Sequence, residues 1–180
     1  DDTVRISYSQ TEIVDDFEDL QHELMREAMR MTGVTSGVEV TTIADIPARG
    51  TGLGSSSTVT VGLLHALYAL AGEEVSAERL AREACEIEIE VLGQTIGKQD
   101  QYAAAYGGVN QIAFNADDTV TVTPLSLGAE TLESLSSEFC LVWTGLSRQA
   151  TPILEQQASN TAGRMEQLVA MRGQANSVAA

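Results

Sequence analysis

The sequence predicts an α+β protein, and three patterns carry that prediction. Residues 3–8 and 37–44 alternate or are rich in β-branched side chains, as strands are, and residues 109–125 have the pattern of a strand, a turn and a second strand. Between them lie segments with an apolar residue every three or four positions, the spacing of amphipathic helices. Helices mixed with an antiparallel hairpin favour α+β over a doubly wound parallel sheet.

The helices are bounded by residues that begin or end helices. Ser76 is an expected N-cap, and Gly33 and Gly93 are expected helix ends. A last strand is expected over residues 139–145. Helices are expected over residues 16–33, from about Ser56 to Gly72, over 76–93, over 99–108 and over 152–171.

Residues 86–91, EIEIEV, are ambiguous because they alternate with period two as a strand does. The helical spacing that begins at Leu80 favours a helix. On a helix Glu86 and Glu90 share one face, while Glu88 points about 160 to 200° away from them, because each residue turns the helix by roughly 100°. One glutamate of the three is thus set apart from the others.

The chain is strongly acidic, with 26 acidic against 10 basic residues and a formal charge of −16. Such a field argues against nucleic acid and anionic membranes as partners. The carboxylates are scattered, which favours a solvated surface, and an anionic substrate would need local compensation. The chain has no apolar run of membrane-spanning length and no signal-peptide pattern at its N-terminus, so a soluble cytoplasmic protein is expected.

The two cysteines, Cys85 and Cys140, lie in apolar contexts without a C-x-x-C spacing. This pattern argues against a disulfide framework or a zinc site, and both are expected to be buried thiols.

A loop rich in glycine and serine opens the second helix: residues 50–57 read GTGLGSSS. Glycines let the backbone approach an anion, and the first N–H groups of a helix point at a bound phosphate. The loop lacks the lysine of a P-loop, and Gly50, Gly52 and Gly54 are spaced by two, unlike the dinucleotide fingerprint. A tight turn that only packs the helix remains the alternative, but the three serines at the helix entry favour an anion site.

With its preceding proline, this stretch resembles the second motif of the GHMP kinases, Pro-x-x-x-Gly-Leu-Gly-Ser-Ser. The matching residues are Pro47, Gly52, Leu53, Gly54, Ser55 and Ser56, and Ser57 stands where alanine is more usual. Residues 97–108, GKQDQYAAAYGG, resemble the G-x-x-D-Q segment of the same family. The resemblance covers about residues 3–150. Within the family, the chain resembles in particular the D-glycero-D-manno-heptose 7-phosphate kinases.

The resemblance implies a role for each matching residue. Backbone amides from Gly52 to Ser56 would hold the phosphates of ATP, and the Ser56 hydroxyl and Glu88 would bind Mg²⁺. Asp100 would act on the substrate hydroxyl as a base or by orienting it; on position alone it is an ordinary first-turn acid of a helix. Lys98, the only lysine, is a candidate for lowering the pKa of Asp100 or contacting a phosphate.

The resemblance also implies the fold and the domains. The fold is that of the GHMP kinase N-terminal domain, a ribosomal-protein-like two-layer arrangement with helices on one face of a sheet. The first and third motifs of the family are not found, so residues 1–147 are expected to form an incomplete N-terminal ATP-binding domain. Residues 148–180 are expected to begin a second α+β domain.

The expected function is a sugar kinase that uses ATP and Mg²⁺, with a heptose 7-phosphate as acceptor at its anomeric hydroxyl. Arg49 and Arg148 are weaker candidates for binding an anionic substrate. Three alternatives stay open: a kinase for a galactose, fucose or uronic acid type of sugar, a non-catalytic nucleotide-binding module, and a structural domain. The oligomeric state is not predicted.

Overall fold

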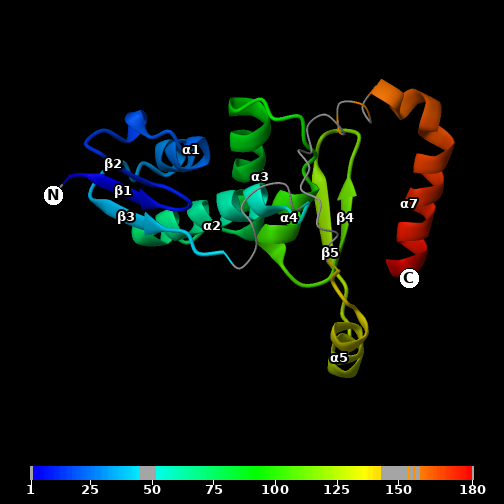
Figure 1. The fold of residues 1–180 in the computed structure, drawn as a ribbon. Coiled ribbons are helices and arrows are strands. Elements are labelled where there is room, and N and C mark those ends of the chain that lie inside the picture. Colours follow the sequence, from blue (N-terminus) through cyan, green and yellow to red (C-terminus); the bar gives the residue numbers. More distant parts are fainter. Residues whose placement is uncertain (1, 45–51, 143–153, 155, 157–158, 180) are drawn as a thin grey trace. The chain divides into compact units, whose positions relative to one another are not determined.

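The computed structural model describes residues 2–44, 52–142, 154, 156 and 159–179 of the chain (Figure 1). One compact unit contains the described residues up to Tyr106, and a second contains those from Gly107 onward. The predicted domain boundary between residues 147 and 148 lies outside the described residues and stays a prediction. The α+β fold class is confirmed, since helices are mixed with two small sheets that each contain an antiparallel pair of strands.

The first unit contains a three-stranded sheet in the order β2-β1-β3 (Figure 1). β1 (Val4–Ser7) pairs antiparallel with β2 (Thr11–Val14) and parallel with β3 (Val38–Thr41), so that Val4 lies opposite both Val14 and Val38. Val4 and Ile6 are buried while Arg5 between them is exposed, as expected of a sheet with one face on the core. The strands predicted over 3–8 and 37–44 are confirmed with shorter bounds, and β2 was not predicted.

Helices supply the rest of the first unit and its core. Leu20, Met29, Leu64 and Ile87 are fully buried and belong to the same apolar cluster as Val4 and Ile6 of β1. The helices are η1 (Phe17–Asp19, 3₁₀), α1 (Glu23–Thr32), α2 (Ser55–Leu70), α3 (Ala77–Cys85), η2 (Glu86–Val91, a π-helix) and α4 (Gln99–Tyr106). α1 packs on α2, and both α2 and α3 pack on α4.

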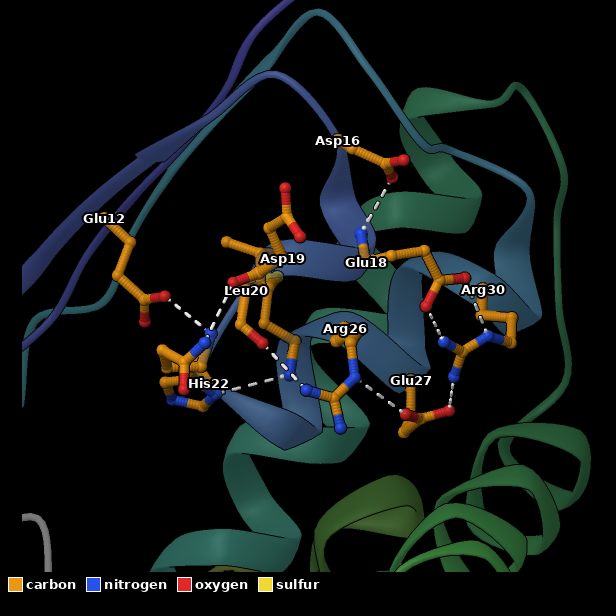
Figure 2. A network of polar contacts seen from close by, with 11 residues as sticks. Glu12, Asp16, Glu18, Asp19, Leu20, His22, Arg26, Glu27 and Arg30 are labelled. Carbon is orange, nitrogen blue, oxygen red and sulfur yellow. Dashed lines mark hydrogen bonds and ion pairs between the residues drawn. The ribbon is translucent and has the colours of Figure 1, made fainter.

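The predicted helix over 16–33 is broken at residues 20–22 by side-chain caps. The Asp16 carboxylate accepts a hydrogen bond from Glu18 N and begins η1, and His22 Nδ1 accepts one from Met25 N and begins α1. Figure 2 shows how ion pairs then join the two helices: Arg30 contacts both Glu18 and Glu27.

Arg26 completes this network from α1. It donates to Glu27 and, over 2.8 Å, to the carbonyl oxygen of Leu20. Burial opposes ionisation of Glu27, but the hydrogen bonds from Arg30 and Arg26 outweigh it and hold the pKa of Glu27 below its usual value.

The second unit contains a hairpin and helices. β4 (Asn110–Phe114) pairs antiparallel with β5 (Val120–Pro124), which confirms the predicted hairpin. The helices whose bounds are described here are α5 (Ala129–Glu138), η3 (Thr161–Arg164, 3₁₀) and α7 (Met165–Ala179). The helix predicted over 152–171 is confirmed at the described residues 154, 156, 159, 160 and 165–171, with the 3₁₀ turn η3 between them, and α5 was not predicted.

Two expectations about the second unit are wrong. Of the strand predicted over 139–145, residues 139–142 are irregular, because in the described chain β4 pairs only with β5 and no neighbour offers them a ladder of hydrogen bonds; residues 143–145 lie outside the described residues. Cys140 lies on this segment and is exposed, whereas Cys85 is buried as expected. Among the described residues, no helix is long and apolar enough to cross a membrane.

Candidate functional site

The end of the glycine loop forms the start of α2. Gly54 is the N-cap of the helix and has φ of 66°, and Gly52 has φ of 71°. These are left-handed conformations that glycine adopts without steric cost. Leu53 between them is 42% exposed, so it is not a core residue. Pro47 and Gly50, which belong to the same predicted loop, lie outside the described residues, as do Arg49 and Arg148.

The first turn of α2 contains the three serines. Ser55 is half-buried, Ser56 is exposed and Ser57 is buried at 2% exposure. The carbonyl oxygen of Ser56 accepts a hydrogen bond of 3.0 Å from the hydroxyl of the buried Thr60. The predicted helix start at about Ser56 is confirmed within one residue.

The charge at this helix start differs from that of the other helices. α2 has no acidic residue in its first turn, whereas every other α-helix with described bounds has one there. An acidic side chain in the first turn would partly satisfy the positive end of the helix dipole. In a chain with a formal charge of −16, α2 therefore differs from the other α-helices with described bounds in having no carboxylate of its own at its N-terminal end.

Asp100 lies directly against the loop end. A β-carbon at Gly54 would stand 3.1 Å from both Cγ and Oδ2 of Asp100, so the carboxylate fills the space that a side chain at Gly54 would need. Asp100 is exposed and stands in the first turn of α4. Two sequence segments predicted to act together are thus brought into contact by the packing of α4 on α2.

Glu88 lies on the π-helical segment that continues α3. The N–H of Leu92 donates to the carbonyl of Ile87, five residues earlier, at 2.9 Å, which is the hydrogen bond that defines a π turn. Glu88 is fully buried, Glu86 is partly buried and Glu90 is exposed. The predicted separation of Glu88 from the other two glutamates agrees with this burial.

Within the described residues, the side chain of the buried Glu88 has one hydrogen-bond partner. Gln101 Nε2 donates to Glu88 Oε2. The other oxygen, Glu88 Oε1, is buried and has no hydrogen-bond partner in the described part of the chain, and the same holds for Gln101 Oε1. Sequence reasoning missed Gln101, which stands beside Asp100 in the matched motif; its contact with a residue 13 positions away is a tertiary feature that no local pattern signals.

Lys98 is half-buried just before α4. Burial raises the pKa of the Cys85 thiol to about 11, Lys98 lowers it through its charge, and Glu88 raises it through its charge. Lys98 and Glu88 therefore both lie near enough to Cys85 to act on it electrostatically. The ammonium group brings positive charge to the part of the unit where Glu88 is buried.

The residues present fit a magnesium ion held mainly by a nucleotide. No group of three or more His, Cys, Asp or Glu side chains within the described residues could hold a metal ion by itself. Mg²⁺, however, usually binds one or two protein oxygens together with substrate phosphates and water. The Glu88 carboxylate oxygen that is buried and has no hydrogen-bond partner among the described residues is a suitable ligand for such an ion.

Comparison with known proteins identifies the family. The family described as GHMP kinases N terminal domain matches residues 19–108, half of the chain. The D-glycero-alpha-D-manno-heptose 7-phosphate kinase of Campylobacter jejuni is 38% identical over 114 residues, which are 63% of this chain and 33% of that protein. The bifunctional fucokinase/GDP-fucose pyrophosphorylase of Arabidopsis thaliana is 27% identical over 140 residues, 73% of this chain and 13% of that protein.

Solved structures agree with the family match. The crystal structure of a D-glycero-D-manno-heptose 1-phosphate kinase from Bacteroides thetaiotaomicron gives a TM-score of 0.72 at 30% identity, covering 90% of this chain and 56% of that one. A putative sugar kinase from Campylobacter jejuni gives 0.66 at 23% identity, covering 99% and 59%, which supports the fold alone. The chain spans a third of the length of the Campylobacter heptose kinase. With half of its residues matched by the family, the chain belongs to the GHMP kinases and carries their N-terminal domain.

Proposed function

We propose that this chain is the nucleotide-binding and catalytic part of a kinase that transfers the γ-phosphate of ATP to a heptose phosphate. The observation that carries the proposal is the carboxylate of Asp100 against Gly54, at the start of a helix whose first turn contains no acid. A phosphate held at this helix start would lie beside a carboxylate that can receive a proton. The names of two relatives, both heptose phosphate kinases, support a heptose phosphate as the acceptor.

Each residue has one task in this mechanism. Backbone N–H groups of the first turn of α2 bind phosphate oxygens of ATP, and the helix dipole adds to the attraction. The Ser56 hydroxyl and the Glu88 carboxylate would hold Mg²⁺. When bound, Mg²⁺ supplies neutralisation of the charge on the phosphates. Lys98 adds positive charge to the same part of a strongly acidic protein.

Asp100 acts on the acceptor. The acceptor hydroxyl oxygen forms a bond to the γ-phosphorus, the bond from that phosphorus to the β–γ bridging oxygen breaks, and ADP leaves. The hydroxyl proton passes to the Asp100 carboxylate, or Asp100 orients the hydroxyl while the proton leaves to phosphate or solvent. The proposed acceptor is the anomeric hydroxyl of D-glycero-D-manno-heptose 7-phosphate, and the product is the 1,7-bisphosphate. The two relatives are named for phosphates at different positions of the sugar, so the acceptor needs a direct test.

The test measures phosphoryl transfer from Mg·ATP by the full-length protein to a panel of sugars and sugar phosphates, read by phosphorus NMR. Asp100→Asn keeps the shape that fits against Gly54 and removes the charge. We expect turnover to fall about 10²- to 10⁴-fold, the usual contribution of a general base, with the affinity for Mg·ATP changed by a few-fold at most. Asp15→Asn, at an exposed aspartate outside the site, is the matched control and should keep wild-type turnover.

The outcomes separate the alternatives. Transfer to galactose, fucose or a uronic acid, and to no heptose phosphate, would replace the acceptor while keeping the kinase. Binding of Mg·ATP without transfer to any acceptor would mean a nucleotide-binding module. Unchanged turnover of Asp100→Asn would remove Asp100 from the chemistry.

A further inference from the structure

Three glutamates are buried among the described residues, and they are satisfied differently. Glu27 and Glu83 are each 7% exposed, and Glu88 is fully buried. Both oxygens of Glu27 accept from arginines, Arg26 and Arg30. Arg79 and the hydroxyl of Tyr68 donate to the two oxygens of Glu83. Glu88, the most buried of the three, has the neutral amide of Gln101 on one oxygen and no hydrogen-bond partner on the other.

The arrangement at Glu88 is costly unless something completes it. A buried polar atom that makes no hydrogen bond costs about 1 to 3 kcal/mol, and more when the group is charged. Gln101, which is also fully buried, has its own Oε1 without a partner. Two unpartnered oxygen acceptors in one buried pair call for a donor or a cation rather than for a further acceptor.

The chemistry of the partner points to a cation. An arginine against Glu88 would neutralise the carboxylate, as happens at Glu27 and Glu83. The amide of Gln101 holds one oxygen of Glu88 without supplying positive charge, so this contact leaves the negative charge of the carboxylate available to a metal ion. Carboxylates that bind metals are commonly held by hydrogen bonds of their own.

We propose that Gln101 is a positioning residue, which fixes the Glu88 carboxylate so that Oε1 meets the magnesium ion of the bound nucleotide. This inference rests on the proposed function and names a residue that acts through Glu88 and not on the substrate. The π turn of η2 and the first turn of α4 supply the two side chains, and the N–H of Gln94 donates to the carbonyl of Glu88 at 2.9 Å, which fixes its backbone.

The experiment measures the dissociation constant of ADP for the full-length protein by calorimetry, once with Mg²⁺ and once with a chelator. Gln101→Met keeps a similar volume and removes the donor. We expect the Mg²⁺-dependent gain in affinity to shrink about tenfold, within the 10- to 100-fold range usual for residues that support a metal ligand. The affinity for metal-free ADP should stay at the wild-type value.

Tyr68→Phe is the matched control, because it removes a neutral donor from another buried glutamate, Glu83, away from the loop. It should lower the stability of the fold and keep the full Mg²⁺-dependent gain. In a Glu88→Gln background, Gln101→Met should cause no further loss of that gain, since Gln101 acts only through Glu88. A general structural role for Gln101 would reduce metal-free binding as well and would add to the effect of Glu88→Gln.

The inference is overturned if Gln101→Met keeps the wild-type Mg²⁺ dependence, or if its loss adds to that of Glu88→Gln. Should Gln101→Met fail to fold, Gln101→Asn keeps the amide but shortens the side chain by one carbon, so that it no longer reaches Glu88, with the same loss expected and a retained gain overturning the inference. The inference is also overturned if the dissociation constant of ADP for the wild type is the same with Mg²⁺ and with a chelator. The transfer assay of the wild type judges the kinase separately, so the two proposals can fail independently.

Discussion

The two units of the chain differ in where their apolar side chains lie. The first unit buries a continuous cluster that joins β1, α1, α2 and α3. In the second unit none of the described residues is buried, and Phe139, Leu141 and Val178 are more than three-quarters exposed. The first unit is therefore held by burial, which is the main favourable term in folding, and the described part of the second by backbone hydrogen bonds, which contribute less.

This difference explains why the candidate site lies wholly in the first unit. A metal ligand and a catalytic carboxylate must be held to within a fraction of an ångström, and close packing provides such rigidity. Glu88 and Gln101 are fully buried, and the exposed Asp100 carboxylate lies against Gly54. The hairpin of β4 and β5, by contrast, is an arrangement that is marginal by itself in water.

Truncating one leucine in each unit tests the comparison most strongly. Leu64 of α2 is fully buried, and Leu168 of α7 is 37% exposed. Leu64→Ala should lower the free energy of unfolding by about 2 to 5 kcal/mol, because it leaves a cavity in the core. Leu168→Ala should change it by about 0.5 kcal/mol or less. Urea unfolding followed by circular dichroism measures both, and equal losses would show that the second unit is held by burial as well.

The two cysteines give a smaller contrast that needs no mutation. Burial raises the pKa of Cys85 from 9.0 to about 11, so near neutral pH its reactive thiolate is about 100-fold scarcer than in an ordinary thiol. Cys140 is exposed. With maleimide at pH 7.5, Cys140 should be labelled first and Cys85 at least about 100-fold more slowly, as read by peptide mass spectrometry. Comparable rates at the two sites would contradict the burial of Cys85.

The ion-pair network of Figure 2 gives the smallest effect, through acid. The pKa of folded Glu27 lies below 4.5, its value without the fold, so its stabilising effect is present above about pH 4.5 and is lost as the pH falls through the lower folded value. Glu27→Gln should reduce the loss of unfolding free energy between pH 5 and pH 3. The reduction should be only about 1 kcal/mol, because Arg30 is partly exposed and its ion pair with Glu27 is screened by solvent.

The control for this change comes from the other unit. Glu133→Gln, at an exposed residue of α5, should leave the acid dependence as it is in the wild type. Identical curves for all three proteins would mean that the network of Figure 2 contributes no measurable stability.

Local patterns predicted those features that local physics decides. Ser76 begins α3 by accepting a hydrogen bond from Arg79 N, and the hairpin, the start of α2 and the separation of Glu88 from Glu86 and Glu90 follow from spacing. The break between η1 and α1 was missed, because apolar spacing continues across two side-chain caps. The contacts of Gln101 with Glu88 and of Asp100 with Gly54 depend on how α4 packs, and periodicity carries no information on that.

Glu90 is an exposed residue of the π-helix η2, and substituting it and deleting it should have different consequences. Glu90 points to solvent, so most side chains should be tolerated there. The π turn nevertheless holds one residue more than an α turn, and each helical residue changes direction by about 100°. Deleting Glu90 would let residues 86–91 close as an ordinary helix and would change the path by which the chain reaches Gly93 and α4. In residues 86–91 the number of residues, more than their side chains, therefore determines whether Glu88 lies within hydrogen-bonding distance of Gln101.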